Sequence, residues 1–319
     1  MSINVARTDD GWWVESDGRL TPIRTEAGTT AELLADRSEV EKAARAPDPN
    51  GPRLQDTEML SPVTVPARVV AQMVNYRSHA QDSGFSPDTV PPAFFRKSSG
   101  SVCGPTADIR CPDHVRFLDY EVELGLVIGR RIDVGTSLTE GELADVVAGI
   151  VVTNDVSARD IQLTRTQFYE SKSYPTFTPV GPFLTLVNGA ELAALERLRL
   201  TLSVNGEVRQ DSTVADMIVK PARALNLLAR FQALDVGDLV LTGTPGGTAL
   251  KSPGAVVEKI GALLPPAVKW KTFFKSQADN PHYLKDGDVV AATISDPIQG
   301  INLGQQMNIV RGPARRAVL

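Results

Sequence analysis

The chain has 319 residues, 42% hydrophobic and 22% charged, which is typical of a globular protein with one large domain or a large and a small one. The formal net charge of -5 gives no basic footprint for nucleic acid, and no apolar run approaches the ~20 residues of a membrane span. Two cysteines and three histidines exclude a disulfide scaffold and a multi-histidine metal site. The first residues lack a signal-peptide pattern, so we expect a cytoplasmic protein.

Residues 1–65 are predicted to form a small leading module. Two short strand candidates, at 12–14 and 20–23, flank a Ser-Asp-Gly turn signal, and residues 30–45 have helical composition. A segment rich in proline and glycine at 47–52 then ends the helix. No residue of this module carries an evident chemical function.

A strand predicted at 69–74 leads into a short helix that carries His79 and Asp82. Residues three apart share a helix face, and a carboxylate beside an imidazole fixes its tautomer and supports a general base. Taken alone, such a pair is more often a surface contact, so both interpretations stay open at this point.

A strand predicted at 118–129 places three acidic residues, Asp119, Glu121 and Glu123, on one face. Neighbouring buried carboxylates repel each other, and a shared cation removes both the repulsion and the burial cost. The alternative is a half-exposed strand with a solvated acidic face. The next apolar strand, at 150–153, delivers Asp155 at its end, where the default role is to cap the following turn.

The second half of the chain adds one candidate cation and one glycine-rich loop. Lys172 lies in a segment with three prolines, and the stretch 242–247 lets the backbone approach a ligand while Thr244 offers a hydroxyl. An Asn-Gly pair predicts a hairpin over 200–209, and a proline at 221 opens a helix to about residue 231. Residues 255–283 are apolar and aromatic; they fit a core, a pocket lining or a subunit interface, and a core is expected.

Taken together, these segments resemble the fumarylacetoacetate hydrolase family. The matching segments are residues 75–79, 119–129, 153–162, 172–182, 241–247 and 287–290. The resemblance implies an α+β, β-rich mixed β-roll, usually dimeric, that binds Mg²⁺ or a similar cation such as Mn²⁺ or Ca²⁺. It divides the chain into the module 1–65 and a catalytic domain at 66–319, with an apolar insertion at about 249–283.

The resemblance also implies roles for individual residues. The metal ligands correspond to Glu121, Glu123 and Asp155, an all-carboxylate set that hard cations prefer. The catalytic residues correspond to His79, Asp82 and Lys172, although many relatives have glutamate where this chain has the shorter Asp82. The substrate contacts correspond to Arg159, Gln162, Gly243 and Thr244.

These roles predict a metal-dependent hydrolase that cleaves a C–C bond in a 1,3-diketone or a 2,4-dioxo acid. The paired His79 and Asp82 would activate water, and Lys172 would stabilise the resulting oxyanion. Two alternatives remain. One is a decarboxylase, isomerase or hydratase that acts on an oxo acid through a metal-bound enolate, and the other is a non-catalytic metal-binding homologue.

Overall fold

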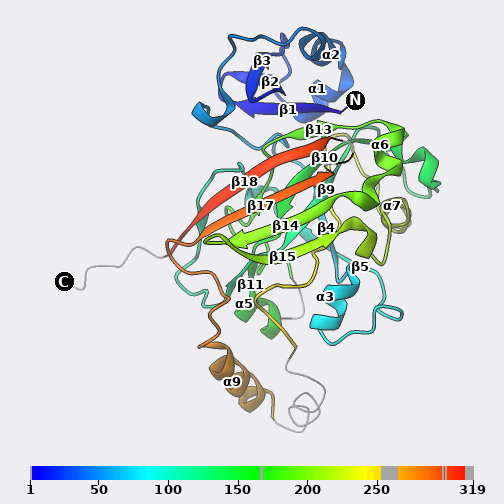
Figure 1. Cartoon of the computed structure of the whole chain (residues 1–319). Coiled ribbons are helices and arrows are strands. Elements are labelled where there is room, and N and C mark those ends of the chain that lie inside the picture. Colours follow the sequence, from blue (N-terminus) through cyan, green and yellow to red (C-terminus); the bar gives the residue numbers. More distant parts are fainter. Residues whose placement is uncertain (1, 166–167, 253–264, 297, 299, 313–319) are drawn as a thin grey trace.

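Two β-sheets form the framework of the computed structural model (Figure 1), which describes residues 2–165, 168–252, 265–296, 298 and 300–312. The larger sheet has nine strands in the order β3-β2-β1-β13-β10-β9-β16-β4-β5. All neighbours pair antiparallel except β16 and β4, so the sheet is mixed. Its strands are β1 (Ile3–Thr8), β2 (Gly11–Ser16), β3 (Arg19–Pro22), β4 (Val69–Met73), β5 (Ala93–Lys97), β9 (Val122–Ile128), β10 (Val147–Asn154), β13 (Leu184–Leu186) and β16 (Leu239–Leu241).

The second sheet has five strands in the order β15-β14-β17-β18-β7. Its strands are β7 (Ile109–Arg110), β14 (Arg199–Val204), β15 (Glu207–Thr213), β17 (Val289–Asp296) and β18 (Ile301–Arg311). Two short ribbons pair β6 (Val102–Cys103) with β12 (Thr178–Pro179) and β8 (Leu118–Asp119) with β11 (Ser157–Ala158). This arrangement confirms the predicted α+β, β-rich mixed roll with a small N-terminal β module.

The helices are short. They are α1 (Thr30–Ala35), α2 (Ser38–Arg45), α3 (Arg77–Asp82), α4 (Leu143–Val146), α5 (Arg159–Thr164), α6 (Gly189–Ala193), α7 (Pro221–Ala229) and α9 (Pro266–Gln277). Of these, α1, α2 and α7 contribute buried side chains to the hydrophobic clusters. Single 3₁₀ turns are η1 (Leu54–Asp56), η2 (Ser99–Ser101), η3 (Glu140–Glu142), η4 (Leu195–Arg197) and η5 (Val214–Asp216). Within the part of the chain that is described, no helix has the length and apolar character that a membrane crossing requires.

Strand β9 is buried on both faces and separates two hydrophobic clusters. Val122, Leu124 and Leu126 face the core between the two sheets, as their alternation predicts. Val127 faces a second cluster that it shares with the N-terminal module. A Cβ at Gly125 would lie 2.6 Å from a methyl group of Val151, so glycine allows β9 and β10 to approach closely there.

The N-terminal module continues the larger sheet. Strand β1 pairs with β13, and Val5 lies opposite Leu184. Trp12 and Val14 of β2 are buried in the cluster that also contains Val127. The module therefore shares a sheet and a core with the rest of the chain, and the boundary at residue 65 stays a prediction.

Three predicted elements differ from the structure. The helix at 30–45 is two helices, because Asp36 has an extended backbone. The strand at 118–129 is interrupted at Tyr120–Glu121: the Asp119 side chain accepts the N–H of Tyr120, and the Asn154 side chain accepts that of Glu121. These side chains replace ladder hydrogen bonds. Residues 139–148, where the sequence also predicts a helix, form η3 and α4 and then pass into β10 at Val147, which pairs with β9. The hairpin is confirmed, with φ of 52° at Asn205 and 83° at Gly206.

Candidate active site

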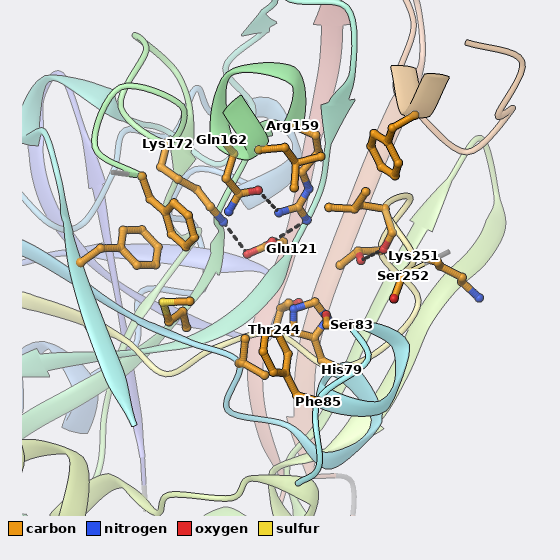
Figure 2. A pocket seen from close by; sticks show the side chains of 18 of the residues that line it. His79, Ser83, Phe85, Glu121, Arg159, Gln162, Lys172, Thr244, Lys251 and Ser252 are labelled. Carbon is orange, nitrogen blue, oxygen red and sulfur yellow. Dashed lines mark hydrogen bonds and ion pairs between the residues drawn. The ribbon is translucent and has the colours of Figure 1, made fainter. Parts of the chain in front are cut away.

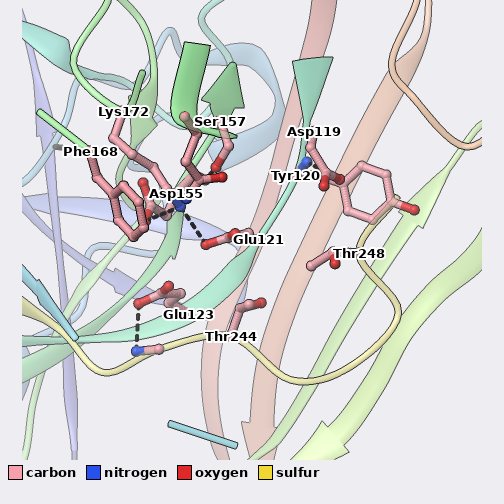
Figure 3. A network of polar contacts seen from close by, with 12 residues as sticks. Asp119, Tyr120, Glu121, Glu123, Asp155, Ser157, Phe168, Lys172, Thr244 and Thr248 are labelled. Carbon is pink, nitrogen blue, oxygen red and sulfur yellow. Dashed lines mark hydrogen bonds and ion pairs between the residues drawn. The ribbon is translucent and has the colours of Figure 1, made fainter. Parts of the chain in front are cut away.

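Three carboxylates converge beside the adjoining ends of β9 and β10. Glu121 precedes β9, Glu123 lies in it, and Asp155 follows β10. The register places Glu123 opposite Thr153, and the N–H of Asp155 donates to the Glu121 carbonyl at 2.8 Å. One oxygen of each carboxylate lies within 4.8 Å of the others, and all three side chains are buried. Figure 3 shows this cluster, which has the composition that the sequence predicts for a metal centre.

Two buried lysines contact these carboxylates. The Lys172 ammonium group donates to Glu121 Oε2 and to Asp155 Oδ2, at 2.7 Å each. Lys97 at the end of β5 also contacts Asp155 and donates to the carbonyl of Phe177 at 2.9 Å. Lys97 was not among the predicted site residues. In sequence, a lysine that ends a short strand is indistinguishable from a solvated one.

Arg159 at the start of α5 connects the cluster to its surroundings. Its Nε donates to Asp119 Oδ2 at 2.7 Å, its Nη2 to Glu121 Oε1 at 2.6 Å, and its Nη1 to Gln162 Oε1 at 2.8 Å. Asp119 also accepts the backbone N–H groups of residues 249 and 250, at 2.8 and 3.1 Å. Four buried carboxylates thus meet three buried cations, which leaves one excess negative charge when every group is ionised.

Glu123 is the carboxylate that the protein compensates least. The N–H of Gly243 donates to its Oε2 at 2.6 Å, and among the described residues no side-chain cation forms an ion pair with it. Burial, followed by the charges of Asp155 and Glu121, raises the pKa of Glu123 well above its usual value. Burial also acts to raise the pKa of Glu121, but Lys172 and Arg159 outweigh it and lower that pKa.

This imbalance fits a bound cation. The three oxygen-donor side chains Glu121, Glu123 and Asp155 are those that Mg²⁺, Mn²⁺ and Ca²⁺ prefer. A divalent cation at this position would also compensate the charge of Glu123, which the protein leaves without a counterion. The donor set therefore supports a divalent metal site, and the identity of the metal stays a prediction.

His79 and Asp82 both lie on α3, but they do not form the predicted hydrogen bond in the described structure. Asp82 Oδ2 accepts the backbone N–H of Gly247 at 3.0 Å. His79 Nδ1 is buried without a hydrogen-bond partner, and burial lowers the pKa of the imidazole. Val74, just before α3, has φ of +52°, a conformation that costs a β-branched residue about 1–3 kcal/mol. The turn that places His79 beside the pocket therefore contains a strained backbone conformation.

The remaining predicted substrate contacts lie around the same cluster. Gly243 approaches Glu123 with its backbone, and its φ of +89° is accessible to glycine without strain. The Thr244 hydroxyl donates to the carbonyl of Val122 at 3.0 Å and accepts from Gln210 at 2.8 Å. Thr244 is therefore held in place by the strands as well as facing the cavity.

A cavity of about 690 Å³ opens beside the cluster (Figure 2). Figure 2 shows His79 across the cavity from Lys172, with Glu121 between them. The polar lining includes His79, Glu121, Glu123, Arg159, Gln162, Lys172 and Thr244. The apolar lining includes Met73, Phe85, Phe95, Leu163, Phe168, Leu250, Trp270 and Phe273.

The apolar insertion contributes to the core only in part: among its described residues, Tyr283 is buried in the core and Phe274 packs against it. In its described part, Trp270 and Phe273 of α9 are half-buried and line the cavity. Residues 253–264 of the insertion lie outside the described residues. The aromatic content of α9 is explained by a wall of the pocket, since a surface helix that faces a cavity keeps an apolar side without entering the core.

Comparison with known proteins finds one matching family and relatives of similar length. The family described as fumarylacetoacetate (FAA) hydrolase C-terminal matches residues 68–311. Oxaloacetate tautomerase YisK of Bacillus subtilis is 30% identical over 299 residues, which cover 89% of this chain and 88% of the relative.

Solved structures match over nearly the whole chain. A probable 2-hydroxyhepta-2,4-diene-1,7-dioate isomerase from Mycobacterium abscessus has a TM-score of 0.73 at 27% identity, covering 98% of this chain and 100% of its own. A fumarylacetoacetate hydrolase from Exiguobacterium antarcticum has a TM-score of 0.70 at 27% identity, covering 98% and 99%. The relatives thus share one fold and carry the names of several reactions.

Proposed function

Because this chain belongs to the fumarylacetoacetate hydrolase family, we propose that it is an enzyme that tautomerises or isomerises a 2-oxo acid. The observation that carries the proposal is the buried cluster of Glu121, Glu123 and Asp155, which opens into a cavity opposite His79. The names of two similar proteins, an oxaloacetate tautomerase and a probable dienedioate isomerase, support this reaction class. This is the alternative that the sequence left beside the hydrolase.

The charges of the cluster explain how an anionic substrate would be held. Lys172 uses two of its three N–H donors on carboxylates, and Arg159 uses three of its five on side chains, so both retain donors for a ligand. When every group is ionised, the cluster alone has one excess negative charge, which opposes a carboxylate substrate. A divalent cation held by Glu121, Glu123 and Asp155 would reverse that charge and act as a Lewis acid towards a substrate oxygen.

Proton transfer is assigned to His79. Tautomerisation moves one proton between the enol oxygen and the α-carbon, which is bonded to the carbon that carries that oxygen, so a single group that accepts and returns a proton is sufficient. Burial keeps the imidazole neutral at neutral pH by lowering its pKa, and the buried Nδ1 has no hydrogen-bond partner among the described residues. A neutral imidazole is able to accept the proton.

Hydrolysis of a C–C bond is the second candidate. The hydrolase name of one similar structure and the position of Lys172, which suits an oxyanion, favour it. The argument that distinguished hydrolysis in the sequence was a His79–Asp82 pair that activates water. Since Asp82 accepts a backbone N–H of Gly247 instead, that argument no longer separates the two reactions.

The test is a product assay with the purified full chain and Mg²⁺. Conversion of enol to keto oxaloacetate is followed by the loss of enol absorbance above the buffer rate, and a panel of acylpyruvates is analysed by product mass. Products of unchanged mass would support the proposal. Two fragments with one added water would establish the hydrolase, and carbon dioxide would establish a decarboxylase.

A test variant and a matched control distinguish loss of the metal site from a general effect of replacing a carboxylate. Glu123→Gln should remove metal-dependent turnover, while Glu26→Gln, which changes an exposed carboxylate, should leave it intact. Tight metal binding by a chain that turns over no compound of the panel would indicate the non-catalytic homologue. The predicted homodimer and the cytoplasmic location stay predictions.

A further inference from the structure

The cavity is much larger than its polar end requires. A volume of about 690 Å³ lies in the range of roughly 300–1,000 Å³ that accommodates drug-sized ligands. The polar groups that would hold a 2-oxo acid are gathered around Glu121, Arg159 and Lys172. A four-carbon acid bound there leaves most of the cavity unfilled, and the rest of the lining combines apolar side chains with a few polar ones, Lys251 and Lys269 among them.

One apolar wall is attached directly to the polar cluster. It consists of Leu250, Trp270 and Phe273, which all line the cavity and which we call the tail wall. The backbone N–H of Leu250 donates to Asp119, the carboxylate that also accepts from Arg159. The tail wall therefore begins at a point fixed by the same carboxylate that orients the arginine.

Helix α9 holds the two aromatic residues of the tail wall in place. Its Phe274 stacks on Phe117, with ring centroids 5.6 Å apart and an interplanar angle of 27°, and Phe117 contacts Tyr283 at 5.0 Å. Phe117 and Tyr283 are buried, so this side of α9 is anchored to the core. The side chain of Asn280 also donates to the carbonyl of Ala249 at 3.0 Å.

The other side of α9 faces the cavity. Residues 269, 272, 273 and 276 all line it, at the spacing of one helix face. Phe273 and Trp270 are half-buried: both line the cavity, and both also contact the ring of Phe274, with ring centroids 5.8 Å apart in each pair. Apolar surface in this position gains stabilisation when a ligand removes it from water.

We propose that the substrate is a 2-oxo acid, or its enol, that carries an aromatic or alkyl tail, and that Leu250, Trp270 and Phe273 bind this tail. The inference rests on the proposed function, because the polar cluster is assigned to the oxo-acid head. Under this proposal the carboxylate cluster carries out the reaction, and the insertion selects substrates by the length of their tail.

The test uses unreactive analogues of a 2-oxo acid, so that binding is measured apart from turnover. Oxamate, N-phenyloxamate and N-hexyloxamate are titrated into the full chain by calorimetry in excess Mg²⁺. The two tailed oxamates should bind on the order of tenfold more tightly than oxamate, as expected when one ring or chain leaves water. The Trp270→Ala/Phe273→Ala variant should lose that difference while its affinity for oxamate is unchanged.

Two further variants control for the helix itself. Val268→Ala changes an α9 side chain that is 46% exposed and outside the cavity lining, so it should keep the preference for tailed oxamates. Phe273→Leu keeps an apolar wall and should retain most of it. Circular dichroism of each variant checks that the fold is intact.

Several results would overturn the inference. They are equal affinity for oxamate and N-phenyloxamate, an undiminished preference in the double variant, or tighter binding of an oxamate whose tail ends in a carboxylate. The last result would assign the far end of the cavity to Lys251 and Lys269, which also line it. Oxaloacetate turnover without a tail preference would overturn only this inference, and a tail preference without turnover would overturn only the proposed reaction.

Discussion

Replacing Glu123 by glutamine should change how the stability of the metal-free protein depends on pH. Burial and the neighbouring Asp155 and Glu121 raise the pKa of Glu123 in the folded chain. The folded state therefore binds a proton that the unfolded state has already released at the same pH. Stability from this group is fully present below its unfolded pKa of about 4.3 and is lost as pH rises towards the folded pKa.

The magnitude follows from the linkage relation and from the geometry. Each like-charged pair of carboxylates within 4.8 Å costs about 3 kcal/mol at an effective dielectric constant of about 20. One proton bound by the folded state alone lowers the free energy of unfolding by about 1.4 kcal/mol per pH unit. Glutamine is neutral at every pH and retains an oxygen for the N–H of Gly243. The wild type should therefore lose stability relative to Glu123→Gln between pH 5 and 7, by at most about 3 kcal/mol over these two pH units.

Urea unfolding in the presence of a chelator, at pH 5, 6 and 7, measures this difference directly. Glu26→Gln, which changes an exposed carboxylate, should follow the wild type at each pH. Adding Mg²⁺ should raise the midpoint of the wild type more than that of Glu123→Gln, and metal binding by the wild type should release a proton. Parallel stability curves for wild type and Glu123→Gln across this pH range would refute the reasoning.

Three further outcomes are expected. Lys97→Met leaves buried Asp155 without one of its cations and should lower the free energy of unfolding by about 3–5 kcal/mol, measured in urea; a loss no larger than that of an exposed-lysine variant would contradict this. His79→Asn should lower kcat by about 10²–10⁴ with little change in KM, whereas Asp82→Asn, which keeps an acceptor for Gly247, should retain most activity; equal losses would restore the predicted pair. Because burial lowers the pKa of His79, the acid limb of the kcat/KM profile should lie below about pH 6.5, and a limb above that value would exclude neutral His79 as the base.

The carboxylate cluster could be predicted because the family resemblance implies its three ligands, whereas spacing alone left a solvated acidic face and a turn cap open. Glu121 and Glu123 lie two positions apart at the start of β9, and the end of β10 places Asp155 beside them. Once β9 and β10 pair as neighbours, no further information is needed to bring the three side chains together. The pairing itself follows from two apolar strands that are buried on both faces.

The cations and the histidine environment could not be predicted in the same way. Lys97 reaches Asp155 across 58 positions of sequence, and Arg159 reaches Asp119 across 40. Such contacts depend on the curvature of the whole sheet, which residue spacing does not encode. The hydrogen bond expected between His79 and Asp82 is not made in the described structure, for a related reason. Helical spacing predicted a contact with Asp82, but the backbone of the loop after β16 offers that carboxylate an N–H donor instead.

Asp119 connects the polar cluster to the start of the apolar insertion. It is fully buried and accepts hydrogen bonds from Arg159 and from the backbone of residues 249 and 250, so the polar cluster and the start of the insertion share one anchor. Beyond that anchor, α9 contacts Phe117 through the ring of Phe274, and Phe117 in turn contacts Tyr283; both Phe117 and Tyr283 belong to the hydrophobic core. Helix α9 is therefore anchored through core residues and not through the carboxylates of the cluster. Substitutions on its cavity face should change the affinity for the substrate's tail and leave the proton-transfer step unchanged.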